Sequence, residues 1–278
     1  HLVPGDLQTR KVDFGELLAY LNLDNNGLLG LILLDRIDRH VEILAQESAG
    51  RDTFLLVPAP HRVGGKTRNA AHLIGGGKVV ATIGKNHLPN YGVFDEARVF
   101  QPAPLPEPVE FKGHKLGVMI CEDMWFADVA GHLKAKGAEL LISVNASPYE
   151  SEKNHIRLAH ARDRVAETGL PLVYVNQCGG QDELVFDGAS FVLNESGQII
   201  VQAEEFVEDI HHTSWEWRET GHWLCGTETL IPMHKGADAI YQALVIGLRD
   251  YVTKNGFPGV LIGMSGGIDS ALSAAIAV

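Results

Sequence analysis

Cysteine is scarce in this 278-residue chain, and the cysteines that are present do not form pairs. Cys121, Cys178 and Cys225 are odd in number, widely spaced and free of any CxxC motif. This pattern argues against a disulfide framework and against a zinc site. A reducing, cytoplasmic compartment is the simplest interpretation.

Long apolar runs and an excess of basic residues are also missing. The segment that comes nearest to a membrane span, Leu28–Leu34, is far too short to cross a bilayer. His1 is not followed by the basic-then-apolar order of a signal peptide. Acidic residues outnumber basic ones 35 to 23, for a net charge of −12. Because nucleic-acid surfaces need clustered Lys and Arg, we expect neither a nucleic-acid nor a membrane partner.

The composition is that of a globular protein with a substantial core. Apolar residues make up 45% of the chain and charged residues 21%. The length suits one large domain plus a piece of another. The chain starts at His1 and ends at Val278 inside an apolar helical pattern, so we interpret it as a fragment or a sequence with segments missing.

Short apolar runs bounded by turn residues predict strands, and apolar residues at helical spacing predict helices between some of them. Helices are expected around Leu34–Leu44 and over Lys153–Thr168, the second ending at Gly169. The expected strands are Thr53–Pro58, Val79–Ile83, Leu116–Ile120, Leu140–Asn145, Leu172–Asn176, Ser190–Leu193 and Ile199–Gln202.

The alternation of strands and helices predicts a layered α/β fold. The stretch His61–Asn69 and the glycines of Gly75–Gly77 have the character of hairpin turns, so part of the sheet should be antiparallel. A mixed sheet of this kind favours a sandwich over a simple doubly wound sheet.

The character of the chain changes from about Glu204. An acidic run, Glu204–Asp209, is followed by the tryptophan-containing segment His211–Trp223, which predicts a connector that packs partly through its tryptophans. We therefore divide the chain into residues 1–203, a connector at 204–235, and the start of a second domain at 236–278.

The second domain is predicted to open with a helix whose apolar face runs from Ile240 to Tyr251. Val260–Met264 then predicts a buried strand that leads into SGGIDS and a new helix. Glycines let a backbone approach an anion, and the N–H groups at the start of a helix favour negative charge. The motif has no Lys of a Walker loop, and an ordinary strand–turn–helix is the alternative.

The sharpest local signal is Cys121 in LGVMICEDMWF, where an apolar strand runs directly into the thiol. Substrates of open α/β folds bind at the carboxyl ends of strands. A cysteine there is more often inert packing, and a nucleophilic one needs a base and a nearby cation. Lys85, which follows a predicted strand and opens a segment dense in polar and aromatic side chains, is the candidate cation. Cys178 and Cys225 are most simply structural.

The Lys85 and Cys121 segments together resemble the nitrilase, or carbon–nitrogen hydrolase, superfamily, and more narrowly the glutaminase domain of glutamine-dependent NAD synthetases. In that family a Lys precedes LPNYGVFDE and the nucleophile lies in an ICED turn. The resemblance runs from about Phe54 to Asn194 and returns from Ala239 to the end, with further matching blocks at Ser147–Glu150, Asn176–Gln177 and Gly179–Asn194. It implies a four-layer α-β-β-α sandwich with a mixed sheet, followed by the first elements of a Rossmann-like ATP-pyrophosphatase domain.

The resemblance also implies a mechanism. Glu16, in FGELLAY, would act as the general base, although Gly15 stands where the family has Pro and both Asp24 and Glu42 are alternatives. Cys121 would attack the amide of glutamine, with the oxyanion held by Lys85 and a backbone N–H near Cys121. Ammonia would leave, and water would release glutamate from the thioester. Glu96 would position the Lys ammonium and the water.

The resemblance assigns the substrates as well. Tyr91, Glu122 and Ser147 would hold the amino-acid end of glutamine, with Glu122 facing its α-ammonium. SGGIDS resembles the pyrophosphate loop of ATP-pyrophosphatases, which implies ATP contacts from Ser265, Gly266, Gly267, Asp269 and Ser270. ATP and Mg²⁺ would adenylate deamido-NAD, and ammonia would displace AMP. The magnesium carboxylates would lie beyond Val278, and the glutaminase part would need neither a metal nor a tightly bound cofactor.

The sequence also allows other interpretations. The chain could be a stand-alone amidase of the same fold, or a catalytically silent scaffold that retains the Cys and the Lys. Another amidotransferase with an ATP-pyrophosphatase partner is more distant, because such enzymes use different glutaminase folds. A homo-oligomer is the expected assembly.

Overall fold

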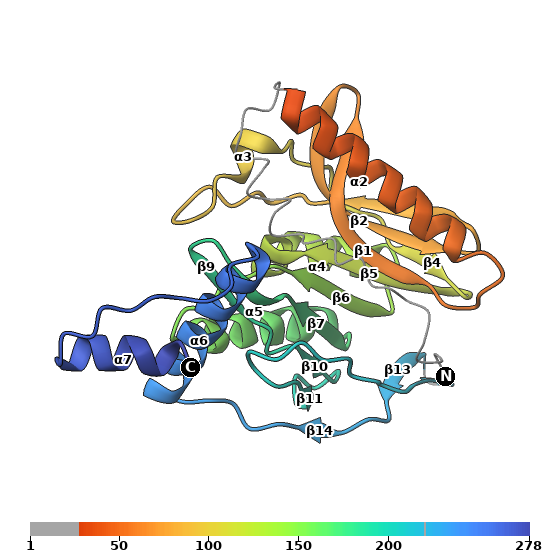
Figure 1. Cartoon of the computed structure of the whole chain (residues 1–278). Coiled ribbons are helices and arrows are strands. Elements are labelled where there is room, and N and C mark those ends of the chain that lie inside the picture. The colour runs from red at the N-terminus through yellow and green to blue at the C-terminus, as the bar shows by residue number, and fades with distance from the viewer. Residues whose placement is uncertain (1–27, 220) are drawn as a thin grey trace.

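Two β-sheets packed face to face form the centre of the computed structural model, which describes residues 28–219 and 221–278 (Figure 1). The first sheet is an antiparallel meander of β1 (Leu55–Val63), β2 (Lys66–Gly75) and β3 (Lys78–Gly84). Its two turns use glycines at positive φ, Gly64–Gly65 and Gly76–Gly77. Both predicted hairpins are therefore confirmed.

The second sheet is mixed and has the strand order β14-β11-β10-β7-β6-β5-β4. Its central strands β5, β6 and β7 run parallel, and β4 and β10 pair antiparallel with β5 and β7. The bounds are β4 Val109–Phe111, β5 His114–Ile120, β6 Leu140–Asn145, β7 Leu172–Asn176, β10 Phe191–Leu193, β11 Ile199–Gln202 and β14 Thr229–Leu230. The predicted mixed sheet is thus confirmed, and the expected bounds of β6, β7 and β11 match the structure.

Helices cover the outer faces of both sheets. Helix α2 (Leu28–Glu47) lies on the first sheet, and α4 (Ala127–Ala135) and α5 (Lys153–Thr168) lie on the second (Figure 1). Helix α5 ends at Gly169, which takes the left-handed conformation expected of a glycine that follows a helix. The four layers are therefore α-β-β-α, as the resemblance implies.

Strand β5 shows why the layers pack in this order. Successive side chains of a strand point to opposite faces, and both faces of β5 are buried. Val118 and Ile120 join the core between the two sheets, where they meet residues of β2 and β3 such as Leu73 and Ile83. Met119 faces the other way, into the core beneath α4 and α5.

The connector packs through its tryptophans, as predicted. It forms a hairpin of β12 (Trp215–Arg218) and β13 (His222–Cys225). Trp215 and Trp223 contact the core between the sheets. The centre of the His114 ring lies 4.8 Å from the centre of the Trp217 ring and 4.5 Å from that of the Trp223 ring. The hairpin therefore packs the connector against the start of β5 in the second sheet.

Helix α6 (Ala237–Lys254) packs on a separate hairpin made of β8 (Cys178–Gln181) and β9 (Leu184–Asp187). A Cβ at Gly180 would lie 2.8 Å from the Gly247 Cα, so Gly180 is needed for this close approach. The Asp250 carboxylate accepts the Gly180 N–H at 2.8 Å, and the Lys254 ammonium donates to the Gly180 carbonyl at 2.7 Å. These contacts hold the start of the expected second domain against the sandwich.

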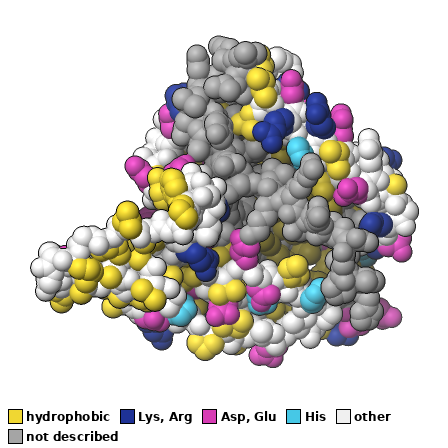
Figure 2. Space-filling model, viewed as in Figure 1, with side chains coloured by type: hydrophobic (Ala, Val, Ile, Leu, Met, Phe, Trp, Pro, Cys, Tyr) yellow, Lys and Arg dark blue, Asp and Glu magenta, His cyan; other side chains and the backbone are white. Residues whose placement is uncertain are grey.

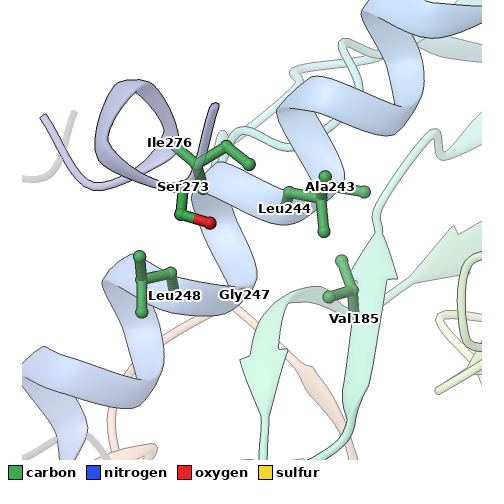
Figure 3. Close-up of a pocket in the computed structure, with 7 residues that line it drawn as sticks. All are labelled: Val185, Ala243, Leu244, Gly247, Leu248, Ser273 and Ile276. Atoms are coloured by element: carbon green, nitrogen blue, oxygen red, sulfur yellow. The ribbon is translucent and has the colours of Figure 1, made fainter. Parts of the chain in front are cut away.

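Helix α7 (Ile268–Ile276) completes the described elements, with the short helices α3 (Glu96–Val99) and η1 (Cys121–Trp125). An apolar cavity of about 350 Å³ lies between α6, α7 and β9 (Figure 3). Apolar side chains also gather on the surface of the protruding arm that carries α7 (Figure 2), where Leu261 and Ile268 are fully or largely exposed.

One predicted strand is wrong. Val260–Met264 has no β-structure, and its residues are exposed. A strand needs a neighbour that accepts its backbone hydrogen bonds, and none of the described strands lies beside this segment. The helix predicted after SGGIDS is present as α7. No helix within the described residues is long and apolar enough to cross a membrane.

Candidate active site

Cys121 stands at the carboxyl end of β5, on the turn into η1. Its backbone has φ of +49°, a left-handed conformation that non-glycine residues rarely adopt. Such a conformation costs on the order of 1–3 kcal/mol and persists where the surrounding structure imposes it. The predicted placement of the thiol on a turn at a strand end is confirmed.

Lys85 directly follows β3 in the opposite sheet. Its backbone N–H donates to the Asn69 carbonyl at 2.8 Å, and its carbonyl accepts the Ala103 N–H at 2.8 Å. A Cβ on the preceding Gly84 would lie 2.6 Å from the Ala103 Cβ, so glycine lets the two segments meet. The Lys85 side chain is fully buried. Lysines at strand ends are usually solvated surface groups, and Lys85 departs from that pattern.

Glu96, the first residue of α3, is the ion-pair partner of Lys85. The Lys85 Nζ lies 2.7 Å from Glu96 Oε1, and Asn69 donates to Glu96 Oε2 at 3.5 Å. A buried ammonium without a counter-charge would be strongly unfavourable. The carboxylate therefore keeps the lysine charged and fixes the direction of its side chain.

The charges of Lys85 and Cys121 act on one another. Burial lowers the pKa of the Lys85 ammonium, but the charges of Cys121, Glu96 and Asp123 raise that pKa by more, so it lies above its ordinary value. Burial raises the pKa of the Cys121 thiol, and the Lys85 ammonium opposes that rise. Lys85 is thus a cation at neutral pH, placed where it favours the thiolate.

Tyr91 and Glu122 are brought together although 31 positions separate them. The Tyr91 hydroxyl lies 2.9 Å from each carboxylate oxygen of Glu122, and Glu122 itself is buried next to Cys121. Tyr91 is half exposed and contacts Phe94. The Lys153 ammonium lies 5.8 Å from the centre of the Phe94 ring. A carboxylate therefore contacts the Tyr91 hydroxyl, and an ammonium that pairs with Glu150 lies near the Phe94 ring.

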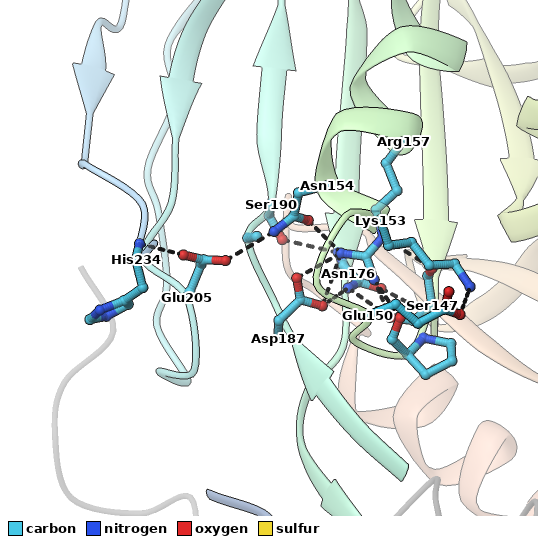
Figure 4. Close-up of polar contacts among 12 residues, drawn as sticks. Ser147, Glu150, Lys153, Asn154, Arg157, Asn176, Asp187, Ser190, Glu205 and His234 are labelled. Carbon is cyan, nitrogen blue, oxygen red and sulfur yellow. Dashed lines mark hydrogen bonds and ion pairs between the residues drawn. The ribbon is translucent and has the colours of Figure 1, made fainter. Parts of the chain in front are cut away.

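Ser147 belongs to a buried polar cluster centred on Arg157 (Figure 4). Arg157 Nε donates to Ser147 Oγ at 3.1 Å, and its NH2 group donates to the carbonyls of Ser147 and Pro148 at 2.7 and 2.9 Å. Its NH1 group pairs with both oxygens of Asp187, at 2.7 and 2.9 Å. Asn176 accepts the Ser147 N–H at 2.9 Å. The guanidinium thus fixes both the backbone and the hydroxyl of Ser147.

Arg157→Leu is expected to lower the free energy of unfolding by about 3–5 kcal/mol, because Asp187 would be left buried without its cation. The check is urea unfolding followed by circular dichroism. Arg162→Leu is the matched control, since Arg162 lies on the same helix but is exposed and donates a single hydrogen bond, to the Gly197 carbonyl. That variant should lose about 1 kcal/mol. Equal losses from the two variants would contradict the assignment.

Three residues of this region escaped sequence reasoning as parts of the site. Arg157 and Asp187 are buried together, and Asp123 is fully buried beside the Lys85 segment. A signal for Arg157 was present: it falls on the buried stripe of α5 with Ala161 and Val165, where a charged residue needs a partner. Nothing in the sequence indicated which acid that partner would be.

Glu16, the expected general base, lies outside the described residues, as does its alternative Asp24. The other alternative, Glu42, is exposed on α2. The structure thus places Lys85, Glu96 and Cys121 in one region, together with Tyr91 and Glu122.

The SGGIDS loop is exposed and bonded to itself. The Ser265 and Ser270 hydroxyls lie 3.1 Å apart, the Gly267 N–H donates to Ser265 Oγ at 3.3 Å, and Gly266 has φ of +81°. Asp269 lies in the first turn of α7. Within residues 28–219 and 221–278, no group of three or more His, Cys, Asp or Glu side chains is arranged to hold a metal ion.

Two family models match the chain. Residues 38–215 match carbon–nitrogen hydrolase, and residues 240–278 match NAD synthase. Curated relatives include glutamine-dependent NAD(+) synthetases from Rhodobacter capsulatus, 46% identical over 209 residues, and from Acinetobacter baylyi, 40% identical over 213 residues. These alignments cover 75% and 77% of this chain but 38% and 39% of the relatives. The chain thus spans about two fifths of their length.

Solved structures show the same likeness. The glutamine-dependent NAD+ synthetase from Acinetobacter baumannii, solved in complex with ADP, is 40% identical, with a TM-score of 0.79 over 87% of this chain and 45% of the other. A carbon–nitrogen hydrolase from Helicobacter pylori is 26% identical, with a TM-score of 0.56 over 63% of this chain and 65% of the other. The family model that matches residues 38–215 covers more than half of the chain, and its match agrees with the four-layer fold and the Cys121–Lys85 pair. By sequence and by structure, the chain belongs to the carbon–nitrogen hydrolase family.

Proposed function

We propose that this chain supplies the glutaminase part of a glutamine-dependent NAD(+) synthetase. The observation that carries the proposal is the buried Lys85–Glu96 ion pair, whose ammonium acts on the thiol of Cys121. A thiol whose thiolate form is stabilised by a fixed cation suits attack on an amide carbonyl, because the cation also stabilises the oxyanion that forms. The relatives and the NAD synthase match at residues 240–278 support the choice of glutamine and of the synthetase reaction.

In the proposed reaction the Cys121 sulfur attacks the side-chain amide carbon of glutamine, and Glu16 takes the thiol proton. Lys85 then stabilises the tetrahedral oxyanion, and Glu96 holds Lys85 in place. Collapse of the intermediate, with proton donation from Glu16, releases ammonia and leaves a thioester. Water, activated by the same carboxylate, releases glutamate and restores the thiol.

The amino-acid end of glutamine carries an ammonium and a carboxylate, and the site offers an opposite charge for each. Glu122, held by Tyr91, would accept the α-ammonium, with Ser147 as a further polar contact. Lys153, whose ammonium lies near the Phe94 ring, is the cation for the α-carboxylate. Arg157 is less suited to that role, because its ion pair with Asp187 is fully buried, whereas Lys153 pairs with Glu150, whose side chain is largely exposed.

Ammonia would be used at a second site that binds ATP through Ser265, Gly266, Gly267, Asp269 and Ser270. Backbone N–H groups and serine hydroxyls in such a loop suit a pyrophosphate. Deamido-NAD would be adenylated there, with Mg²⁺ accompanying ATP, and ammonia would displace AMP. The free thiols of the three cysteines support a reducing, cytoplasmic setting, and we retain a homo-oligomer as the proposed assembly.

The experiment measures glutamate release from glutamine by the chain, and again by a longer protein that contains it together with a complete synthetase domain, with and without ATP and deamido-NAD. Glutamate release that rises when both ligands are added supports the proposal. Release that ignores them would favour a free amidase of the same fold, and absence of release would favour a silent scaffold.

Glu122→Gln is expected to raise the KM for glutamine by roughly ten- to a hundredfold and to change kcat much less. A hydrogen bond to a charged group contributes roughly 1.5–3 kcal/mol, and the amide would still accept the Tyr91 hydroxyl while losing the charge. Steady-state glutaminase kinetics provide the check. Glu110→Gln, an exposed acid of β4, is the control and should behave as wild type. A fall in kcat with unchanged KM would argue against substrate binding by Glu122.

A further inference from the structure

Asp123 is a completely buried carboxylate between the two segments that carry Lys85 and Cys121. One of its oxygens accepts the backbone N–H groups of Asn86 and His87, at 3.0 and 2.8 Å. Its other oxygen accepts the backbone N–H of Ile120 at 3.1 Å. Both carboxylate oxygens therefore accept hydrogen bonds from backbone N–H groups, and the side chain has no contact with solvent.

These three N–H donors lie at the ends of strands that belong to different sheets. Asn86 and His87 follow β3 of the first sheet, directly after Lys85, whereas Ile120 ends β5 of the second sheet, directly before Cys121. Asp123 itself lies in η1, whose short turn begins at Cys121. One carboxylate thus joins the end of the lysine strand to the end of the cysteine strand.

The chemistry of the side chain explains why a carboxylate stands here. An ionised carboxylate offers only acceptors, so it can receive N–H groups from two directions at once. An amide of the same shape would turn an N–H donor toward one of the two segments. A donor facing a donor inside a closed core is unfavourable and pushes the segments apart.

We propose that Asp123 is a positioning residue that sets where the Lys85 ammonium lies relative to the Cys121 sulfur by tying the two strand ends together. The inference rests on the proposed glutaminase function for its role in turnover. Its geometric content, the placement of a cation beside a thiol, can be tested without any substrate.

The test compares Asp123→Asn with wild type in two measurements on the full chain. Steady-state kinetics with glutamine should show kcat reduced at least about tenfold and KM within about threefold. The rate of Cys121 alkylation by iodoacetamide as a function of pH should show a midpoint shifted upward. Asp128→Asn is the matched control, because Asp128 contacts the His87 ring of the same segment from the exposed side and should leave both readouts unchanged.

The direction of the alkylation shift separates positioning from a simple charge effect. The Asp123 charge raises the pKa of the Cys121 thiol, so removing it without any movement would lower the midpoint. The Lys85 ammonium lowers that pKa more strongly than Asp123 raises it, so displacing the ammonium raises the midpoint. A midpoint that falls or stays in place overturns the proposal.

Asp123→Glu is a second variant in case Asp123→Asn does not fold, as judged by thermal unfolding. It keeps the charge but lengthens the arm, so positioning predicts the same loss of kcat and upward midpoint shift, whereas a pure charge effect predicts no change. A pH midpoint of Cys121 alkylation that equals the wild-type midpoint in either folded variant overturns the proposal. Should the wild-type chain lack glutaminase activity, the proposed function fails, while the thiol titration still decides the role of Asp123.

Discussion

Replacing Cys121 with Ala is expected to abolish glutamine hydrolysis, with a loss of about 10⁴-fold or more in kcat. The covalent route needs the sulfur, and removal of a nucleophile that acts together with a base leaves only the small contribution of binding and oxyanion stabilisation. Cys121→Ser should lose nearly as much, because a hydroxyl is far harder to ionise than a thiol. Glutamate release measured by a coupled assay gives the result.

Cys225→Ala is the control for this prediction. Cys225 lies on β13 in the connector hairpin and contacts the Thr227 carbonyl, so its removal should leave kcat within about twofold of wild type. Mass spectrometry adds an independent readout, since an electrophilic glutamine analogue should modify Cys121 and no other cysteine. Glutamine hydrolysis that survives in Cys121→Ala would remove the basis of the proposed function.

Replacing Lys85 with Met should reduce kcat by about 10³-fold. Loss of one oxyanion donor alone costs about 10²–10³ in kcat, and here the same group also favours the thiolate. Because the ammonium lowers the pKa of the Cys121 thiol, its removal should shift the pH midpoint of alkylation upward. Glu96 would also lose its partner, so unfolding must be followed in parallel.

Lys78→Met is the matched control, because Lys78 begins the strand after which Lys85 stands but is exposed. Its kcat and alkylation midpoint should match wild type. Lys85→Arg is expected to rescue little, since the larger planar guanidinium has to fit a site in which the lysine side chain is fully buried. Near-normal turnover in Lys85→Met would show that the ammonium does not take part in the reaction.

Local sequence patterns predicted most of the elements that build the sandwich. Strands β6 and β7 and helix α5 have the bounds expected from apolar runs and from the glycine after the helix, because those signals lie within each segment. Val260–Met264 shows the limit of this reasoning. Its apolar run is typical of a buried strand, but a strand also requires neighbours that pair with it, and pairing is not written in the segment itself.

The candidate site shows the same difference between signals within one segment and contacts between distant segments. The motifs around Lys85 and Cys121 could be found by resemblance, and so could Glu96, Tyr91, Glu122 and Ser147. The partners of Arg157 could not, because they come from segments that are distant in sequence and meet only after the two sheets and α5 pack.

By itself, the sequence determined most strands and helices of the sandwich, the thiol at a strand end and the family to which the chain belongs, because each depends on residues that are close together in the chain. Only the tertiary structure decided that Lys85 is a buried cation beside Cys121, and that one carboxylate, Asp123, joins the segments that carry them. The physical reason is that burial and charge pairing arise when the two sheets close on each other, and neither exists in an isolated segment.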